Sequence, residues 1–219
     1  LVADYSPGHD VESAFMAAYK KAGGEVIGSV RVPMTTTEFA PYLQRVKDTR
    51  PDILFAYVNG GDVSPAFIKE YRQRGLADAG IKLLGTGDIS YESSLPAMGD
   101  GALDTVTVYP YSAVHKSAMN EKFVSDFMAL GAQKEQPNVM GVSAYDGMAA
   151  IYAALKKTSG KADGDTLIAA LKGLKFESPR GPLAIDATTG DVIQNEYIRR
   201  VQKVNGQLQN VEFETIPPS

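Results

Sequence analysis

The sequence predicts an α/β fold built on a doubly wound parallel sheet, with a helical region and a hairpin after it. In the first half, short apolar strands alternate with amphipathic helices, which is typical of parallel sheets with helical crossovers. One strand, ILFAYV at 53–58, is apolar throughout, as expected of a strand covered on both faces. In the second half, three helical patterns follow one another without an intervening strand.

Five strands are expected in the first half, at residues 1–4, 26–32, 53–58, 81–84 and 104–110. Ser6 and Pro7 have the residue types of an N-cap and a first helical position, and Gly23 with Gly24 ends this first helix. Thr37 is expected to cap the second helix. A third helix runs through Phe67 and Tyr71, which form its buried face, and ends at Gly75.

Helical spacing recurs three times in the second half. The apolar positions are Met119, Phe123, Phe127 and Leu130, then Met140, Ala144, Met148, Ile151 and Leu155, then Leu167, Ile168 and Leu171. A strand GPLAID, a turn TTGD and a strand EYIRRVQKV follow. Asn205-Gly206 is a strong signal for a two-residue hairpin turn, with LQNVEF as the returning strand.

Two features indicate part of a two-lobed protein. The chain opens within a strand of four residues, shorter than the usual five or six, and the three later helices have apolar faces without a sheet to cover them. We expect residues 1–110 to form a C-terminal-type α/β lobe, residues 111–186 the helical part of an N-terminal lobe, and residues 187–219 a return crossover and hairpin. The alternative is one complete domain with a helical extension.

Composition excludes several classes of function. The net charge of -4 argues against binding to nucleic acid or to an anionic membrane surface, because both favour clustered lysine and arginine. The chain has no cysteine, and its two histidines, His9 and His115, lie far apart, so no thiolate or zinc chemistry and no cofactor are expected. No apolar run approaches the roughly 20 residues of a membrane helix.

Three loops are expected to meet at one edge of the sheet. Parallel α/β sheets bind ligands beyond the carboxyl ends of their strands, where the strand order reverses. With the order 2-1-3-4-5, the loops there contain Tyr5, Asn59, Gly60, Thr86, Gly87 and Asp88. Gly85 and Gly87 would open the last loop so that Asp88 faces a ligand. The alternative for each residue is an ordinary turn or helix cap, which is the role expected for Asp62.

Catalytic motifs are incomplete. GTGDIS begins like a dinucleotide-binding glycine motif but has Ser90 where the third glycine belongs. GVSAY has Tyr145 where a nucleophile elbow needs glycine, and it lies within a helical pattern.

The order of several segments resembles one known family. LVADYSPGHD, FAPYLQRVKDTRPDILFAYVNGGD, IKLLGTGD and YDGMAAIYAALKKT together resemble the type I periplasmic solute-binding proteins of ABC importers, in the Leu/Ile/Val-binding branch. The resemblance implies two α/β lobes joined by three crossovers, with the chain beginning at the second lobe. In this chain the crossovers would lie near 109–112 and 184–194.

The resemblance also implies roles for individual residues. Tyr5 matches the family's cleft tyrosine, Asn59 and Gly60 lie in the next contact loop, and Asp88 corresponds to the acidic residue that takes a ligand ammonium. Met140 matches a position that covers the ligand's apolar part. The implied function is capture of a small amino acid, in the periplasm or at the cell surface, and delivery to a membrane permease. Apart from the resemblance, the three later helices are expected to expose their apolar faces or to bury them by self-association of the chain.

Other readings remain open at this stage. The ligand could be another amino acid, an amide or a small aromatic acid. A sensory domain of the same fold would use the same pocket. An enzyme would use Asp62 and Asp88 as paired carboxylates.

Overall fold

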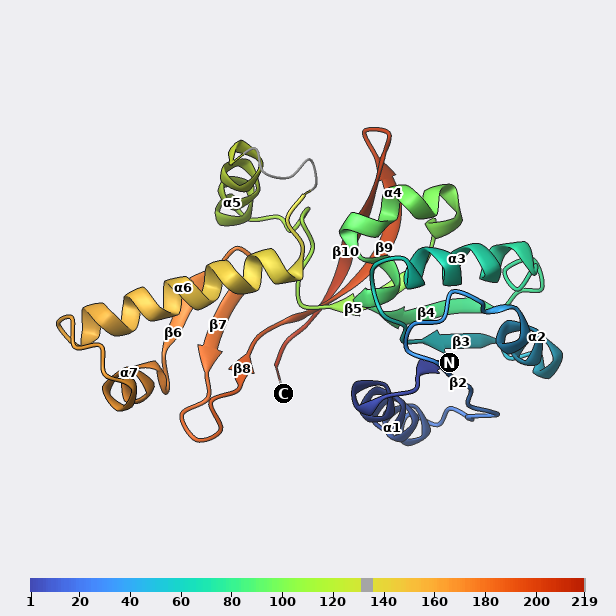
Figure 1. The fold of residues 1–219 in the computed structure, drawn as a ribbon, viewed down its shortest axis with the longest axis horizontal. Coiled ribbons are helices and arrows are strands. Elements are labelled where there is room, and N and C mark those ends of the chain that lie inside the picture. Colours follow the sequence, from blue (N-terminus) through green and yellow to red (C-terminus); the bar gives the residue numbers. More distant parts are fainter. Residues whose placement is uncertain (131–135, 219) are drawn as a thin grey trace. The chain divides into compact units, whose positions relative to one another are not determined.

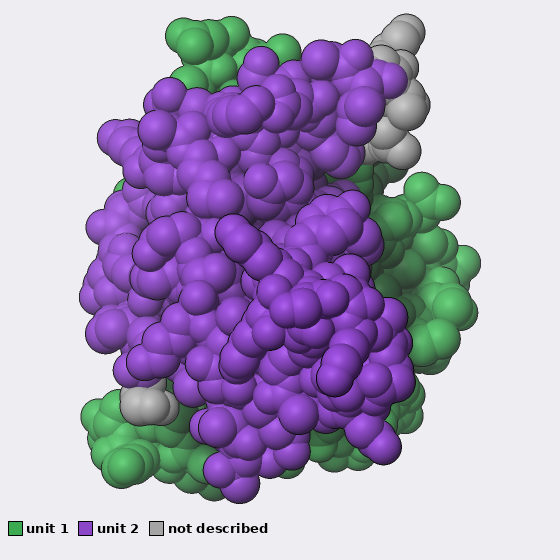
Figure 2. Space-filling view, turned by 90° about the vertical axis from the view of Figure 1, so that its left-hand side faces the viewer, with its two compact units in different colours: residues 1–108, 200–209 green, residues 109–199, 210–219 purple. Residues whose placement is uncertain are grey.

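The chain forms two compact units in the computed structural model, which describes residues 1–130 and 136–218. Unit 1 comprises residues 1–108 and 200–209, and unit 2 comprises residues 109–199 and 210–219 (Figure 2). The chain therefore changes unit three times. The first change lies beside the crossover expected at 109–112. The second change, between residues 199 and 200, lies beyond the crossover expected at 184–194. The segment 187–219 was expected to return to the first lobe, but only its residues 200–209 belong to unit 1.

Unit 1 is built on a sheet with the predicted strand order. Its parallel strands are β1 (Val2–Ala3), β2 (Arg31–Val32), β3 (Ile53–Ala56), β4 (Lys82–Thr86) and β5 (Val106–Tyr109). β1 pairs with β2, a bridge from Val2 to Tyr57 joins β1 to the end of β3, and β3, β4 and β5 follow. This order, β2-β1-β3-β4-β5, confirms the doubly wound prediction. β9 (Glu196–Val204) and β10 (Gln207–Ile216) come after β5 in the strand order.

Helices cover both faces of this sheet. The helices of unit 1 are α1 (Ser6–Lys21), α2 (Ala40–Thr49), α3 (Val63–Gln73) and α4 (Leu95–Met98), with 3-10 turns at Gly87–Ser90, Glu92–Ser94 and Gly99–Ala102. α3 and α4 lie on one side of β3, β4 and β5, and α1 lies on the other (Figure 1). Val201 of β9 contributes to the core of unit 1, where it is fully buried in the same cluster as Phe39 and Phe67.

Some local predictions for unit 1 were wrong. The strand expected at 26–32 is reduced to Arg31–Val32, because β1 offers only two residues for pairing. The expected caps are displaced: Tyr5 rather than Ser6 is the N-cap residue of α1, and Phe39 rather than Thr37 that of α2. β3 is not buried on both faces, since Leu54 and Ala56 are buried while its other two residues are half-buried.

Unit 2 contains helices and a small antiparallel sheet. Its helices are α5 (Ala118–Ala129), α6 (Val139–Lys157) and α7 (Gly164–Leu171), close to the three predicted segments. The sheet has the order β6-β7-β8, from β6 (Lys175–Ser178), β7 (Gly181–Ile185) and β8 (Val192–Ile193). β6 was not predicted. In its hairpin with β7, Gly181 follows the turn and pairs with Ser178, at φ 100°, a conformation that only glycine adopts freely.

A buried ion pair links α6 to the hairpin within unit 2. Arg180 Nε lies 2.8 Å from Asp146 Oδ2, and both side chains are less than a tenth exposed. The pKa of Asp146 is raised, because burial of its carboxyl outweighs hydrogen bonding by Ser178 and the attraction of Arg180. Tyr197 of β9 donates from its hydroxyl to the carbonyl of Arg180 at 2.6 Å.

One face of α6 is apolar and exposed. Its largest exposed side chains are Met140 at 67%, Tyr152 at 63% and Met148 at 46%. Their spacing of four and eight residues places them along one side of the helix. Self-association through this face stays a prediction. Within the described residues, no helix has the length and apolarity needed to cross a membrane.

Candidate functional site

Three aromatic residues and three polar ones gather where β1, β3 and β4 end in unit 1. We call this set, formed by Tyr5, Tyr57, Asn59, Thr86, Asp88 and Tyr91, the tyrosine edge. Tyr5 follows β1, Tyr57 and Asn59 follow β3, and Thr86 ends β4. Because parallel strands end on the same side of a sheet, their loops meet there. The edge therefore occupies the place where a doubly wound sheet binds ligands.

Hydrogen bonds at the tyrosine edge have a fixed direction. Asn59 Nδ2 donates to the carbonyl of Met34 at 3.3 Å, so its Oδ1 faces Tyr5 and accepts the Tyr5 hydroxyl proton at 2.9 Å. The hydroxyl oxygens of Tyr5 and Tyr57 lie 2.5 Å apart. Since the single Tyr5 proton is already donated to Asn59, Tyr57 must donate to Tyr5. The two rings are stacked with centroids 6.1 Å apart.

This proton order agrees with the electrostatics of Tyr57. The pKa of its hydroxyl is raised well above the ordinary value, first by burial and then by its hydrogen bond to Tyr5. The carboxylate of Asp88 adds to the increase. Asp88 also raises the pKa of Tyr91, after burial and the nearby Glu92. Asp88 therefore imposes a negative potential on both phenol groups.

The loop after β4 holds Asp88 by a local contact. The hydroxyl of Thr86 donates to Asp88 Oδ2 at 2.9 Å. Asp88 is half-buried, in the first turn of the 3-10 segment Gly87–Ser90. Gly60 lies against the edge, since a Cβ there would meet the ring of Tyr91 at 3.8 Å. The predicted residues of three separate loops thus surround one region of unit 1.

The role expected for Gly85 was wrong. It does not open the loop, because it is a buried residue of β4 paired with Ala56 of β3. A Cβ at Gly85 would lie only 2.4 Å from the carbonyl oxygen of Ala56 and 2.6 Å from the side chain of Ile89. Glycine is needed here for the close approach of two strands.

Two further predicted residues stand apart. Asp62 occupies the N-cap position of α3, but its side chain makes no capping hydrogen bond and its backbone is helical. Met140 belongs to unit 2 and is exposed at the start of α6, so the structure does not group it with the tyrosine edge. Its ligand contact stays a prediction.

Tyr57 and Tyr91 are the residues that sequence reasoning missed. Tyr57 lies in the apolar run ILFAYV and was treated as part of the buried strand. The strand ends at Ala56, however, so Tyr57 comes at the carboxyl end where its hydroxyl meets that of Tyr5. An aromatic residue with a polar tip at the last position of a buried strand was the signal available in the sequence.

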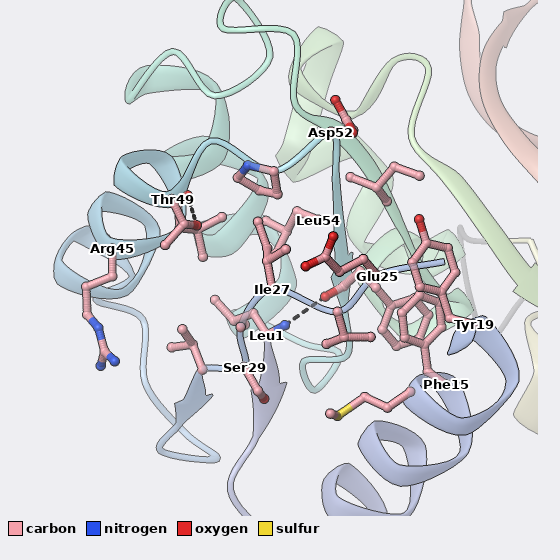
Figure 3. Close-up of a pocket in the computed structure, with 18 of the residues that line it drawn as sticks. Leu1, Phe15, Tyr19, Glu25, Ile27, Ser29, Arg45, Thr49, Asp52 and Leu54 are labelled. Carbon is pink, nitrogen blue, oxygen red and sulfur yellow. Dashed lines mark hydrogen bonds between the residues drawn. The ribbon is translucent and has the colours of Figure 1, made fainter. Parts of the chain in front are cut away.

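A pocket of unit 1 lies elsewhere. It has a volume of about 560 Å³ and is lined by residues of α1, by residues 25–30, and by residues 45–55 from α2 to β3 (Figure 3). Residues 49–53 lead into β3, so the pocket lies toward the amino end of that strand, away from the tyrosine edge. The Leu1 amino group, which donates to the Phe55 carbonyl at 2.8 Å, borders it.

The chemistry available at the tyrosine edge is hydrogen bonding. Phenol hydroxyls, an amide and a carboxylate can orient a small polar molecule. Among the described residues, no group of three or more histidine, aspartate or glutamate side chains could hold a metal ion.

Comparison with solved structures gives close matches. A solute-binding protein of an ABC transporter from Rhodopseudomonas palustris BisB5, in complex with 3,4-dihydroxybenzoic acid, is 46% identical with a TM-score of 0.91. One from R. palustris HaA2, in complex with p-hydroxybenzoic acid, is 40% identical with a TM-score of 0.94. Each match covers 99% of this chain, and about 60% of those chains.

Curated relatives and a family model agree with these matches. A Leu/Ile/Val-binding protein homolog 6 from Brucella melitensis biotype 1 is 40% identical over 216 residues, or 98% of this chain. The chain spans about half the length of this relative, 55%. The model of a family described as periplasmic binding protein matches residues 1–207. The chain therefore belongs to the periplasmic binding protein family.

Proposed function

We propose that the chain is the solute-capturing part of an ABC importer and that its solute is a small hydroxylated aromatic acid. The observation that carries the choice of ligand is the tyrosine edge, a set of phenol, amide and carboxylate groups at the ligand-binding end of the sheet. Hydroxybenzoates are the ligands bound by solute-binding proteins that are 40–46% identical to this chain. Benzoate is bound by a relative at 27% identity.

The proposed mechanism is binding without chemistry. The solute is enclosed by two lobes that close by hinge bending at the crossovers, and the closed form docks on a membrane permease. The three passages of the chain between its units support hinges at residues 108–109, 199–200 and 209–210. The capture step would take place outside the cytoplasmic membrane, in the periplasm or at the cell surface.

A second candidate ligand is a small amino acid, branched-chain or similar. Asp88 favours it, because a half-buried carboxylate can pair with a ligand ammonium. The name of the Brucella relative points in the same direction. In that case Asp88→Ala would leave a buried cation without its partner, at a cost of roughly 2–5 kcal/mol, or about 30-fold or more in affinity.

Mass spectrometry of what co-purifies with the full-length gene product tests the ligand class. We expect a hydroxylated benzoic acid, and titration calorimetry should then give tight binding of 4-hydroxybenzoate and weak binding of leucine. Tight binding of leucine, lost in Asp88→Ala and kept in Asp62→Ala, would favour the amino-acid candidate. Turnover of a bound acid would contradict a pure binding role.

A further inference from the structure

The direction of the hydrogen bonds at the tyrosine edge leaves one open position. Tyr57 donates its proton to Tyr5, Tyr5 donates to Asn59, and Asn59 donates to the carbonyl of Met34. Each of these three donors is held in place by its acceptor, and the last acceptor is a backbone carbonyl. In the described part of the chain, the Tyr57 oxygen accepts no hydrogen bond, so its lone pairs are available. Tyr57 is half-buried and can be reached by a small molecule.

An open acceptor selects the chemistry of its partner. A ligand hydroxyl can donate to the Tyr57 oxygen without disturbing the series. A ligand carboxylate only accepts, so it could bind here only if Tyr57 turned its proton away from Tyr5. The carboxylate would also enter the negative potential of Asp88, which adds to the effect of burial in raising the pKa of both Tyr57 and Tyr91.

We propose, building on the proposed function, that the tyrosine edge binds the ring hydroxyl of a hydroxybenzoate, which donates its proton to the oxygen of Tyr57. Unit 1 thus binds the hydroxylated end of the ligand, and the ligand carboxylate points away from the tyrosine edge. Tyr57 is then the residue that distinguishes hydroxylated from plain benzoic acids. Tyr5 and Asn59 are positioning residues, because they hold the Tyr57 proton away from the ligand.

The ring hydroxyl of the ligand should raise its binding affinity by a measurable factor. A ligand without a donor leaves the Tyr57 oxygen buried and unpaired, which typically weakens binding by about 10-fold or more. The matched pair of ligands is 4-hydroxybenzoate and 4-fluorobenzoate, which are similar in size but differ in the donor. The selectivity ratio, defined as the affinity for the first divided by the affinity for the second, is the quantity to measure.

Titration calorimetry of the full-length gene product and its variants tests the proposal. We expect a ratio of about 10 or more in the parent, and a ratio near 1 in Tyr57→Phe with the affinity for 4-fluorobenzoate nearly kept. Tyr5→Phe should also lower the ratio, because it frees the Tyr57 proton to face the ligand. Tyr19→Phe, in α1, is the matched control and should keep the parent ratio.

Each other result has a separate meaning. If neither benzoate binds the folded parent, the proposed ligand class fails. If both bind with equal affinity, the proposed ligand class stands, and the proposal that the tyrosine edge recognises the ring hydroxyl is overturned. If the ratio survives in Tyr57→Phe, the hydroxyl is read by another residue. Circular dichroism of each variant checks folding, and Tyr5→Phe provides a second test should Tyr57→Phe not fold.

Discussion

Replacing Gly85 by alanine should loosen the sheet directly beneath the tyrosine edge. The new Cβ would lie 2.4 Å from the carbonyl oxygen of Ala56, a distance that real Cβ contacts do not reach. That oxygen belongs to the backbone of β3, so it cannot turn aside as a side chain would. β3 and β4 must therefore separate at this level, and the Ile89 side chain, 2.6 Å from the same Cβ, must move as well.

The expected loss follows from overpacking in a buried position. Forcing an extra methyl group into a packed core typically costs about 1–3 kcal/mol, and a backbone neighbour places Gly85→Ala toward the upper end. For a chain of this length each kcal/mol lowers the melting temperature by about 2–4 °C, so we expect a fall of about 2–12 °C. Thermal unfolding followed by far-ultraviolet circular dichroism measures this fall.

A second signal should come from the tyrosines. The chain has no tryptophan, so its near-ultraviolet circular dichroism arises mainly from its 11 tyrosines. Tyr57 follows Ala56, and we expect its contact with Tyr5 to be disturbed in Gly85→Ala. Gly28→Ala is the matched control, since a Cβ there has no heavy atom within 4 Å. Equal melting temperatures and near-ultraviolet spectra for both variants would refute the reasoning.

Three further predictions concern separate contacts. Asp146→Ala should cost about 3–5 kcal/mol in urea unfolding, because it leaves the buried Arg180 cation unpaired, and adding Arg180→Met should recover part of the loss. Asn138→Ala should cost about 1 kcal/mol in the same assay, because the Asn138 side chain caps α6 by accepting from two backbone amides. The pKa of Glu12 is lowered by its hydrogen bond to Ser29 and by a paired arginine, so its contribution is present above the unfolded pKa and lost as pH falls through the lower folded value. Glu12→Gln should therefore flatten the acid side of a stability–pH curve, and an unchanged acid side would contradict this.

The order of the sheet could be predicted from the sequence because it depends on long patterns. Alternation of apolar strands with amphipathic helices is repeated over many residues, and the Asn205-Gly206 turn has a specific backbone requirement that the structure confirms, with both residues at positive φ. The short strand β6 could not be predicted in this way. Its four residues have no apolar alternation, and its pairing depends on the turn before Gly181 rather than on its own composition.

The location of the candidate site could be predicted from the sequence, but its hydrogen bonds could not. Topology alone brought Tyr5, Asn59 and Asp88 to one edge, since it fixes where strands end. Tyr57 was missed because the end of β3 differed from the expected end by two residues. Which hydroxyl donates to which acceptor depends on distances of a few tenths of an ångström, and those follow from three-dimensional packing.

The threefold passage of the chain between its units has a consequence for synthesis. Unit 1 needs residues 200–209 to complete its core, including the buried Val201, but all of residues 109–199 are made first. While they are being made, residues 1–108 have one side of their core unfilled. Closing so long a loop is slow and exposes apolar surface in the meantime. Unit 1 therefore cannot finish folding until residues 200–209 have been synthesised.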